Sequence, residues 1–292
     1  MRSFKILLAV VAVIVFGLYG AVRVRDSLLT DHTAPVISFD SDTVTVSVGD
    51  DESALLAGVT AQDNRDGDLS GQVMVRSISQ FIEPRTALVS YIVFDAADNI
   101  GTASRNVVYS DYRSPHFALS EPLIYRVGST VTLTDRLSAD DVLDGDLSGS
   151  IRLVSSNFNN TAEGTGTLTV QVTNSMGDAA QLELPVIFAV LSPQDPEITL
   201  TDALVYLPVG ADFRAEDYLA EVTDPLYAPT AAGDEEEGEE PQTVDLRGAV
   251  TVDSNVDTGT PGSYRVFYTY QSGDGTTART AMTALTVVVE EQ

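Results

Sequence analysis

The first thirty residues contain a long apolar run that has no counterpart later in the chain. Ile6–Val22 comprises 17 uncharged, mostly apolar residues. As a helix this run would be ~26 Å long, at the short end of what spans the hydrocarbon core of a bilayer. A cleaved signal peptide is the alternative, but Leu18 or Tyr19 would then occupy the −3 position, which prefers a small residue. The pattern therefore favours an uncleaved anchor in the cell membrane, with residues 1–30 as anchor and stalk.

After this run the hydrophobic pattern changes to a period of two. In Thr43–Val48 and Thr167–Val172, β-branched residues alternate with other side chains, which is typical of strands packed on one face. No later segment has a long helical period, although residues 52–57 and 214–219 could each form one turn. One set of alternating residues is expected to share a buried face: Tyr264, Val266, Tyr268 and Tyr270. The chain is therefore predicted to be all-β after its first helix.

Three blocks of sequence recur in the same order. Each repeat opens with a proline-led strand that ends near a glycine, and Pro35, Pro115 and Pro196 mark the three openings. Next comes RDGDLSGQVMV from Arg65, matched by LDGDLSGSIRL from Leu143 and more weakly by TVDLRGAVTV; last comes an alternating strand. The repeats predict three tandem β-sandwich domains, at residues 31–112, 113–192 and 193–292, in a serial rod of roughly 100 Å.

The first repeat carries a resemblance to a known family. Its opening Pro-Val-Ile, the stretch DNRDGDLSGQVMV (Asp63–Val75), a proline-initiated strand with Tyr91, and DAADNIGTA (Asp95–Ala103) resemble the bacterial immunoglobulin-like surface domains named after an insecticidal crystal protein. That family is related to the HYR and cadherin-like sandwiches. The resemblance implies a seven-stranded sandwich that serves as a spacer or adhesion module outside bacterial cells. It also implies a cytoplasmic amino terminus and extracellular repeats.

Composition narrows the function further. The chain has 16 Lys and Arg against 43 Asp and Glu, a formal net charge of −27, which excludes a general nucleic-acid binder. It has no cysteine and two histidines, so disulfides, thiolate zinc sites and cysteine catalysis are excluded. No phosphate loop, nucleophile elbow or zinc-protease motif is present. The sequence thus predicts a non-catalytic, membrane-anchored surface protein that acts as a stalk or adhesion module with a protein partner.

One constellation of oxygen-bearing side chains suggests a metal. Carboxylates at alternate positions around a glycine turn suit calcium, which takes six to eight hard oxygen ligands. The alternative is that the same residues form turns, with Asp66 and Asp68 accepting hydrogen bonds from backbone amides. Repeat two holds a similar group around Asp144, and Asp245 stands nearly alone in repeat three, so a calcium effect should fade along the chain. The candidate calcium ligands are Asp63, Asp66, Asp68, Asp95, Asp98 and Asn99.

Two further features leave alternatives open. An acidic insertion at residues 228–243 is expected to be a solvated surface loop in repeat three. Exposed aromatic residues such as Phe158 and Phe267 would be needed for a second function, the binding of cell-wall or host glycans. A third possibility is that the protein is a structural subunit of a larger membrane assembly.

Overall fold

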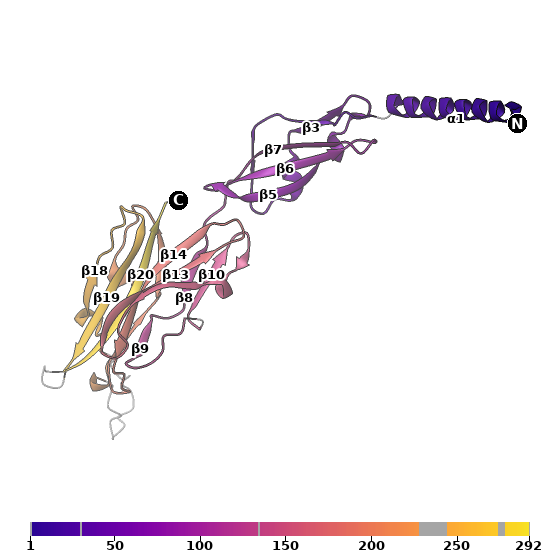
Figure 1. Ribbon diagram of the computed structural model, residues 1–292. Coiled ribbons are helices and arrows are strands. Elements are labelled where there is room, and N and C mark those ends of the chain that lie inside the picture. Colours follow the sequence, from indigo (N-terminus) through magenta and orange to yellow (C-terminus); the bar gives the residue numbers. More distant parts are fainter. Residues whose placement is uncertain (1, 30, 134, 228–243, 274–277, 292) are drawn as a thin grey trace, which may run out of the picture. The chain divides into compact units, whose positions relative to one another are not determined.

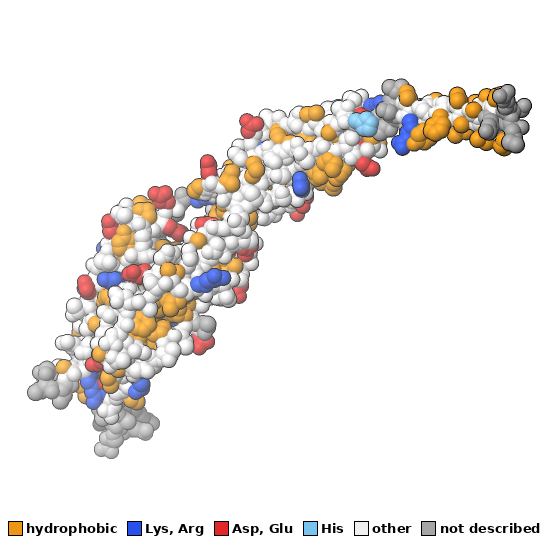
Figure 2. Space-filling view, in the orientation of Figure 1, with side chains coloured by type: hydrophobic (Ala, Val, Ile, Leu, Met, Phe, Trp, Pro, Cys, Tyr) orange, Lys and Arg blue, Asp and Glu red, His pale blue; other side chains and the backbone are white. Residues whose placement is uncertain are grey.

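A single long helix precedes the sheets. The computed structural model describes residues 2–29, 31–133, 135–227, 244–273 and 278–291, so the acidic insertion at 228–243 lies outside the described residues. Helix α1 spans Arg2–Leu29 and contains the apolar run found in the sequence (Figure 1). Its membrane-length segment Ile6–Arg25 has none of its residues buried, and hydrophobic side chains cover its visible face (Figure 2). Helix α1 continues to Leu29, past Val22, where the apolar run of the sequence ends.

The first β-sandwich lies between residues 36 and 109. Its opening segment is divided between two sheets: β1 pairs antiparallel with β3, whereas β2 pairs parallel with the last strand, β7. The rings of Phe39 and Tyr91 meet across the two sheets, with centroids 5.3 Å apart. The two sheets have the orders β1-β3-β4 and β2-β7-β6-β5. The strands are β1 (Val36–Phe39), β2 (Thr43–Val46), β3 (Val59–Asp63), β4 (Gly67–Asp68), β5 (Met74–Glu83), β6 (Thr86–Phe94) and β7 (Ile100–Tyr109).

The second sandwich repeats this arrangement. Its sheets have the orders β11-β10-β8 and β12-β13-β14-β9, and β9 again pairs parallel with the last strand. One core cluster unites both sheets, with Phe117 from the first and Leu168 and Leu184 from the second. The strands are β8 (His116–Leu119), β9 (Ile124–Arg126), β10 (Leu137–Asp141), β11 (Gly145–Asp146), β12 (Arg152–Asn157), β13 (Gly164–Thr173) and β14 (Ala179–Ala189).

The third sandwich has six strands among its described residues. The predicted face of β19 is confirmed, since Val266, Tyr268 and Tyr270 are buried in its core cluster and Tyr264 packs against it. Its sheets have the orders β15-β17 and β16-β20-β19-β18. The strands are β15 (Glu197–Leu200), β16 (Leu204–Pro208), β17 (Leu219–Thr223), β18 (Thr251–Ser254), β19 (Gly262–Ser272) and β20 (Arg279–Glu290).

Short 3-10 turns, rather than longer helices, connect the strands of the described sandwiches. The two turns expected from the sequence are present, and a buried tyrosine hydroxyl donates a hydrogen bond to each: Tyr91 to the Leu55 carbonyl at 2.6 Å and Tyr268 to the Ala215 carbonyl at 2.7 Å. These bonds satisfy polar groups inside the cores. The turns are Glu52–Leu56, Ser70–Gln72, Ser148–Ser150, Ala215–Tyr218, Pro225–Tyr227 and Arg247–Ala249.

The chain forms two compact units, residues 1–112 and 113–292. The second unit holds two sandwiches, which lie side by side: β14 contacts β19 and β20, as Figure 1 also shows. The start of β8 meets the end of β20, where His116 Nε2 lies 3.0 Å from Glu290 Oε2 and the His116 ring stacks on Tyr206. The expectation of a serial rod is therefore wrong for these two sandwiches, because the chain turns back after β14. The residue boundaries of the three repeats stay predictions.

Candidate functional site

The turn after β3 is shaped by an aspartate that ends the strand. Asp63 pairs with Gly67 across a tight loop, and Gly67 has φ +74°, a conformation that favours glycine. Asp63 Oδ1 accepts hydrogen bonds from the backbone N–H groups of Asp66 and Arg65 at 2.9 and 2.8 Å. These bonds lower the pKa of Asp63 despite the opposing effect of burial. This carboxylate is consequently held in its charged form.

The turn after β6 brings a second carboxylate to the same end of the sandwich. Asp95 Oδ1 accepts from the N–H groups of Ala97 and Asn99 at 2.9 and 2.7 Å, and Oδ2 accepts from the Asn99 side-chain amide at 2.7 Å. The same amide also donates to the backbone carbonyl of Asp31 at 3.1 Å. Asn99 thereby fixes the turn and holds the segment that follows helix α1 beside it.

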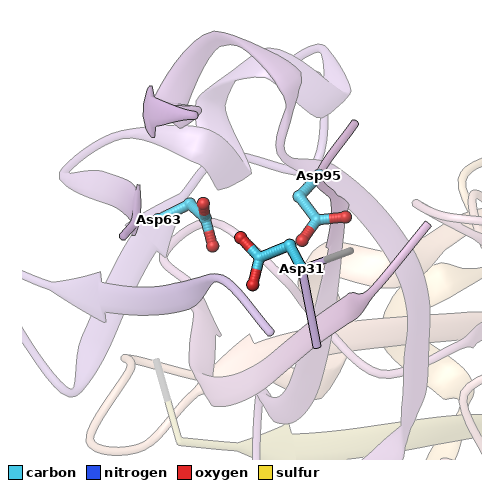
Figure 3. Close-up of side chains that lie close together, drawn as sticks. All are labelled: Asp31, Asp63 and Asp95. Atoms are coloured by element: carbon cyan, nitrogen blue, oxygen red, sulfur yellow. The ribbon is translucent and has the colours of Figure 1, made fainter. Parts of the chain in front are cut away.

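Three carboxylates meet where these segments converge. One oxygen from each of Asp31, Asp63 and Asp95 lies within 4.8 Å of an oxygen from each of the others, and Figure 3 shows the three groups facing one another. The residues are only 7%, 9% and 6% exposed. Oδ2 of Asp31 and Oδ2 of Asp63 are buried without a hydrogen-bond partner. The nearest opposite charge is Arg65, whose Nε lies 3.6 Å from Asp31 Oδ2. We name these three residues the carboxylate cluster.

The structure divides the residues that the sequence proposed as calcium ligands. Asp63 and Asp95 belong to the carboxylate cluster, and Asn99 supports it. Asp66 instead joins the two loops, its Oδ2 accepting from the Ala96 N–H at 2.8 Å. Asp68 caps the following turn through Ser70, and Asp98 is an exposed turn residue with φ +62°. Asp68 thus makes the local contact of the turn alternative, whereas the carboxylate of Asp66 accepts from a backbone amide of the other loop.

Sequence reasoning missed Asp31, the third carboxylate of the cluster. It belongs to none of the three recurring blocks, and it lies 32 residues from Asp63 along the chain. Its contact with the loops depends on the path of the chain between α1 and β1. No local sequence pattern predicts the path of the chain between α1 and β1. The one signal in the sequence was an acidic residue five positions before Val36, where the first strand begins.

The second sandwich has the same corner with one decisive change. Asp141 ends β10 as Asp63 ends β3, and its Oδ1 accepts from the N–H groups of Leu143 and Asp144 at 2.9 and 3.0 Å. In the place of Asp95 stands Asn174, whose side-chain amide donates to Asp141 Oδ2 at 3.1 Å. Both Asp141 and Asn174 are buried. The second corner thus satisfies its own carboxylate with an amide.

In the third sandwich, a tyrosine hydroxyl is the hydrogen-bond donor to the aspartate at this corner. Asp224 follows β17 at the position of Asp63, and its Oδ1 accepts from the Leu226 N–H at 2.9 Å. Its Oδ2 accepts from the Tyr270 hydroxyl at 3.0 Å. Burial and the Asp224 carboxylate raise the pKa of Tyr270 to about 12, so the phenol stays a donor. Asp245, the residue that stood nearly alone, instead pairs with Arg247, whose guanidinium lowers the pKa of Asp245 to about 2.

A second feature lies within the unit of residues 113–292. Phe158 and Phe267, the aromatic residues considered for a glycan platform, are both half-buried and line one cleft of about 440 Å³. Phe158 also packs on the core ring of Phe188, with centroids 5.3 Å apart. The guanidinium of Arg265 lies over the Phe267 ring at 6.0 Å. The remaining lining residues are Asn157, Asn159, Thr165, Gly166 and Thr167.

Comparisons with known proteins give only distant structural likenesses. No family model matches the chain, and a search of curated proteins finds no relative. A Clostridium perfringens ZmpB structure described as the M60 catalytic domain with CBM51-1 and CBM51-2 domains is 11% identical; the match covers 88% of this chain and 31% of that one, with a TM-score of 0.23. Another ZmpB chain is matched over 30% of its length. This chain therefore spans less than a third of either.

Cadherin structures match the chain with similarly low sequence identities and TM-scores. Human CDH23 EC21-23 is 16% identical, with 88% of this chain and 100% of that one covered and a TM-score of 0.21. Drosophila N-cadherin EC1-4 is 11% identical, with 85% and 73% covered and a TM-score of 0.25. At such TM-scores these likenesses carry no argument about function.

Proposed function

We propose that the chain is a membrane-tethered, non-catalytic interaction module of a cell surface. One observation carries the proposal: the apolar segment Ile6–Arg25 is wholly exposed, and sandwiches follow it along the chain. Twenty helical residues span ~30 Å, the thickness of a hydrocarbon core, and an apolar helix of this length is unfavourable in water. A bilayer would supply the missing apolar environment.

The proposed orientation places the sandwiches outside the cell. The two ends of α1 carry similar numbers of basic residues, so charge alone does not set the orientation. The first repeat resembles modules that act outside bacterial cells, and the net charge of −27 suits a soluble, repelling surface. A protein partner is proposed because the sandwiches offer broad faces formed by their sheets.

Membrane extraction and protease accessibility test the anchor. Full-length protein expressed in a bacterial host should stay in the membrane pellet after an alkaline carbonate wash, and protease added to spheroplasts should digest the sandwiches. Val13→Asp, which places a charge at the centre of the span, should release the chain, whereas Val13→Leu should not, because a central charge costs about 3 kcal/mol. A shortened wild-type chain in the soluble fraction would show a cleaved signal and refute the tether.

The cleft of Phe158 and Phe267 supports a second candidate function, glycan binding. An aromatic ring offers stacking area to a sugar, and the Asn and Thr side chains of the cleft offer hydrogen bonds to hydroxyl groups. Phe267→Ala should then abolish binding on a glycan array. Thr269→Ala, on the same half-buried side of β19, is the matched control. An array without any hit for the wild-type chain would exclude this candidate.

A further inference from the structure

The charges at the carboxylate cluster do not balance. As carboxylates, Asp31, Asp63 and Asp95 have formal charges that sum to −3, and the guanidinium of Arg65, 3.6 Å from Asp31 Oδ2, contributes one formal positive charge. The sum of these four groups is −2. Buried charges are normally paired or coordinate a metal, and a buried oxygen without a partner carries a desolvation cost. Two such oxygens, Oδ2 of Asp31 and Oδ2 of Asp63, lie in this cluster.

The other two sandwiches show that the fold itself does not require this imbalance. The aspartate at the same corner is satisfied by the Asn174 amide in one and by the Tyr270 hydroxyl in the other. Only in the first sandwich does a carboxylate face further carboxylates among the described corners. The other two corners show that an amide or hydroxyl donor is enough for this corner to fold. The first corner instead has unpartnered carboxylate oxygens, which are suited to a cation.

The chemistry of the cluster selects the kind of ion. All three side chains present hard carboxylate oxygens, and neither histidine nor cysteine belongs to the group. Calcium accepts such ligands in irregular geometries and completes its shell with carbonyls and water. Magnesium demands near-octahedral geometry at shorter distances and gives up water reluctantly. A single calcium ion would also bring the charge sum of −2 to zero.

We propose that the carboxylate cluster of Asp31, Asp63 and Asp95 binds one calcium ion, which ties the segment after helix α1 to two loops of the first sandwich. Asp31 lies two residues beyond Leu29, the end of α1. Asp63 and Asp95 belong to the turns after β3 and β6. Bound calcium stiffens the joint next to the helix; without it, repulsion among the three carboxylates loosens the joint.

Calorimetric titration of the full-length chain in nanodiscs of zwitterionic lipid tests the site. We expect one calcium ion per chain, with a dissociation constant between ~0.1 and ~1 mM, as is usual for extracellular modules. Asp63→Asn and Asp95→Asn should each weaken binding at least about tenfold, because affinity depends on the number of charged ligands. Magnesium should bind more weakly than calcium.

Asp98→Asn is the matched control. Asp98 lies in the same loop as Asp95, is exposed and lies outside the cluster, and asparagine tolerates its positive φ. The control therefore removes the same charge without removing a ligand, and its calcium affinity should equal that of the wild type. Equal weakening by Asp98→Asn and Asp95→Asn would indicate general attraction to an acidic surface and overturn the proposal.

Hydrogen exchange tests the joint independently of affinity. Calcium should slow exchange together in three segments, residues 31–35, 63–68 and 95–99, compared with EGTA. Asp31→Asn should remove the protection of residues 31–35 while part of the protection of the two loops remains. Folding of the variants is checked by thermal unfolding in EGTA, where Asp95→Asn reproduces the arrangement of the second sandwich. No binding up to about 10 mM calcium, well above the usual extracellular range, would mean that the cluster does not hold this ion.

Discussion

The corners of the first and second sandwiches share their turn contacts but differ in the groups that face the buried aspartate. In both, an aspartate ends the strand and its Oδ1 accepts two backbone N–H groups, at 2.8 and 2.9 Å for Asp63 and at 2.9 and 3.0 Å for Asp141. The decisive difference is the partner of the other oxygen, a carboxylate environment in one and Asn174 in the other. The second corner therefore satisfies its buried aspartate with an amide, whereas the first corner, which adds Asp31 and Asp95, leaves two buried carboxylate oxygens without a hydrogen-bond partner.

The largest expected change in stability comes from a substitution that makes the second corner resemble the first. Asn174→Asp replaces the amide that donates to Asp141 Oδ2 and buries two facing carboxylates. In EGTA the free energy of unfolding of residues 113–292 should fall by about 3 kcal/mol, since an uncompensated buried charge is costly. Differential scanning calorimetry of the full-length chain measures this loss, and millimolar calcium should restore part of it.

If Asn174→Asp in EGTA had the same free energy of unfolding as the wild type, the comparison of the two corners would be wrong. It would mean that facing carboxylates at this corner carry no cost. The unpartnered oxygens of the first sandwich would then give no reason to expect a cation.

The third sandwich extends the comparison to a phenol donor. Tyr270→Phe removes the hydroxyl that donates to the Asp224 carboxylate, and the free energy of unfolding should fall by about 2 kcal/mol because the acceptor is charged. Tyr268→Phe is the matched control on the same strand. Its hydroxyl donates to a neutral carbonyl of Ala215, so the loss should be about 1 kcal/mol. Equal losses in urea titrations would show that the charge of Asp224 adds nothing.

The reverse exchange in the first sandwich should have the opposite sign. Asp95→Asn removes one of three repelling carboxylates and offers an amide to Asp63. In EGTA the melting temperature of the first unit should rise by about 4 °C, which corresponds to roughly 1 kcal/mol in a domain of this size. The stabilisation by calcium should disappear at the same time. A lower melting temperature in EGTA would mean that Asp95 is needed chiefly for its turn contacts with Ala97 and Asn99.

The sequence predicted the fold better than the site, for a physical reason. Period-two burial and turn chemistry are local, so the strands, two of the 3-10 turns and the buried face of Tyr268 and Tyr270 could be derived from short stretches. Asp63 and Asp95 could be found because both lie in turns next to predicted strands. Asp31 and the side-by-side packing of two sandwiches depend on the path of the chain between elements. No local pattern encodes that path.

The smallest expected change in stability concerns an aspartate–serine contact that the first two sandwiches share. Asp68 and Asp146 each accept from the hydroxyl and N–H of the serine two residues later, and these bonds lower the pKa of both carboxyls. A pKa lowered by folding stabilises the protein above the ordinary aspartate value of 3.8, and this contribution is lost as pH falls through the lowered pKa. Asp68→Asn and Asp146→Asn should therefore cause small, equal losses of stability at pH 7.

These two losses should shrink together as pH falls below about 4, because the wild-type carboxyls are then protonated as well. Thermal unfolding in EGTA between pH 7 and pH 3 measures them. Since both side chains are exposed and neither belongs to the carboxylate cluster, calcium should leave the difference between the two variants unchanged. If calcium altered the effect of Asp68→Asn alone, the ion would reach beyond the three buried carboxylates into the turn that the two sandwiches share.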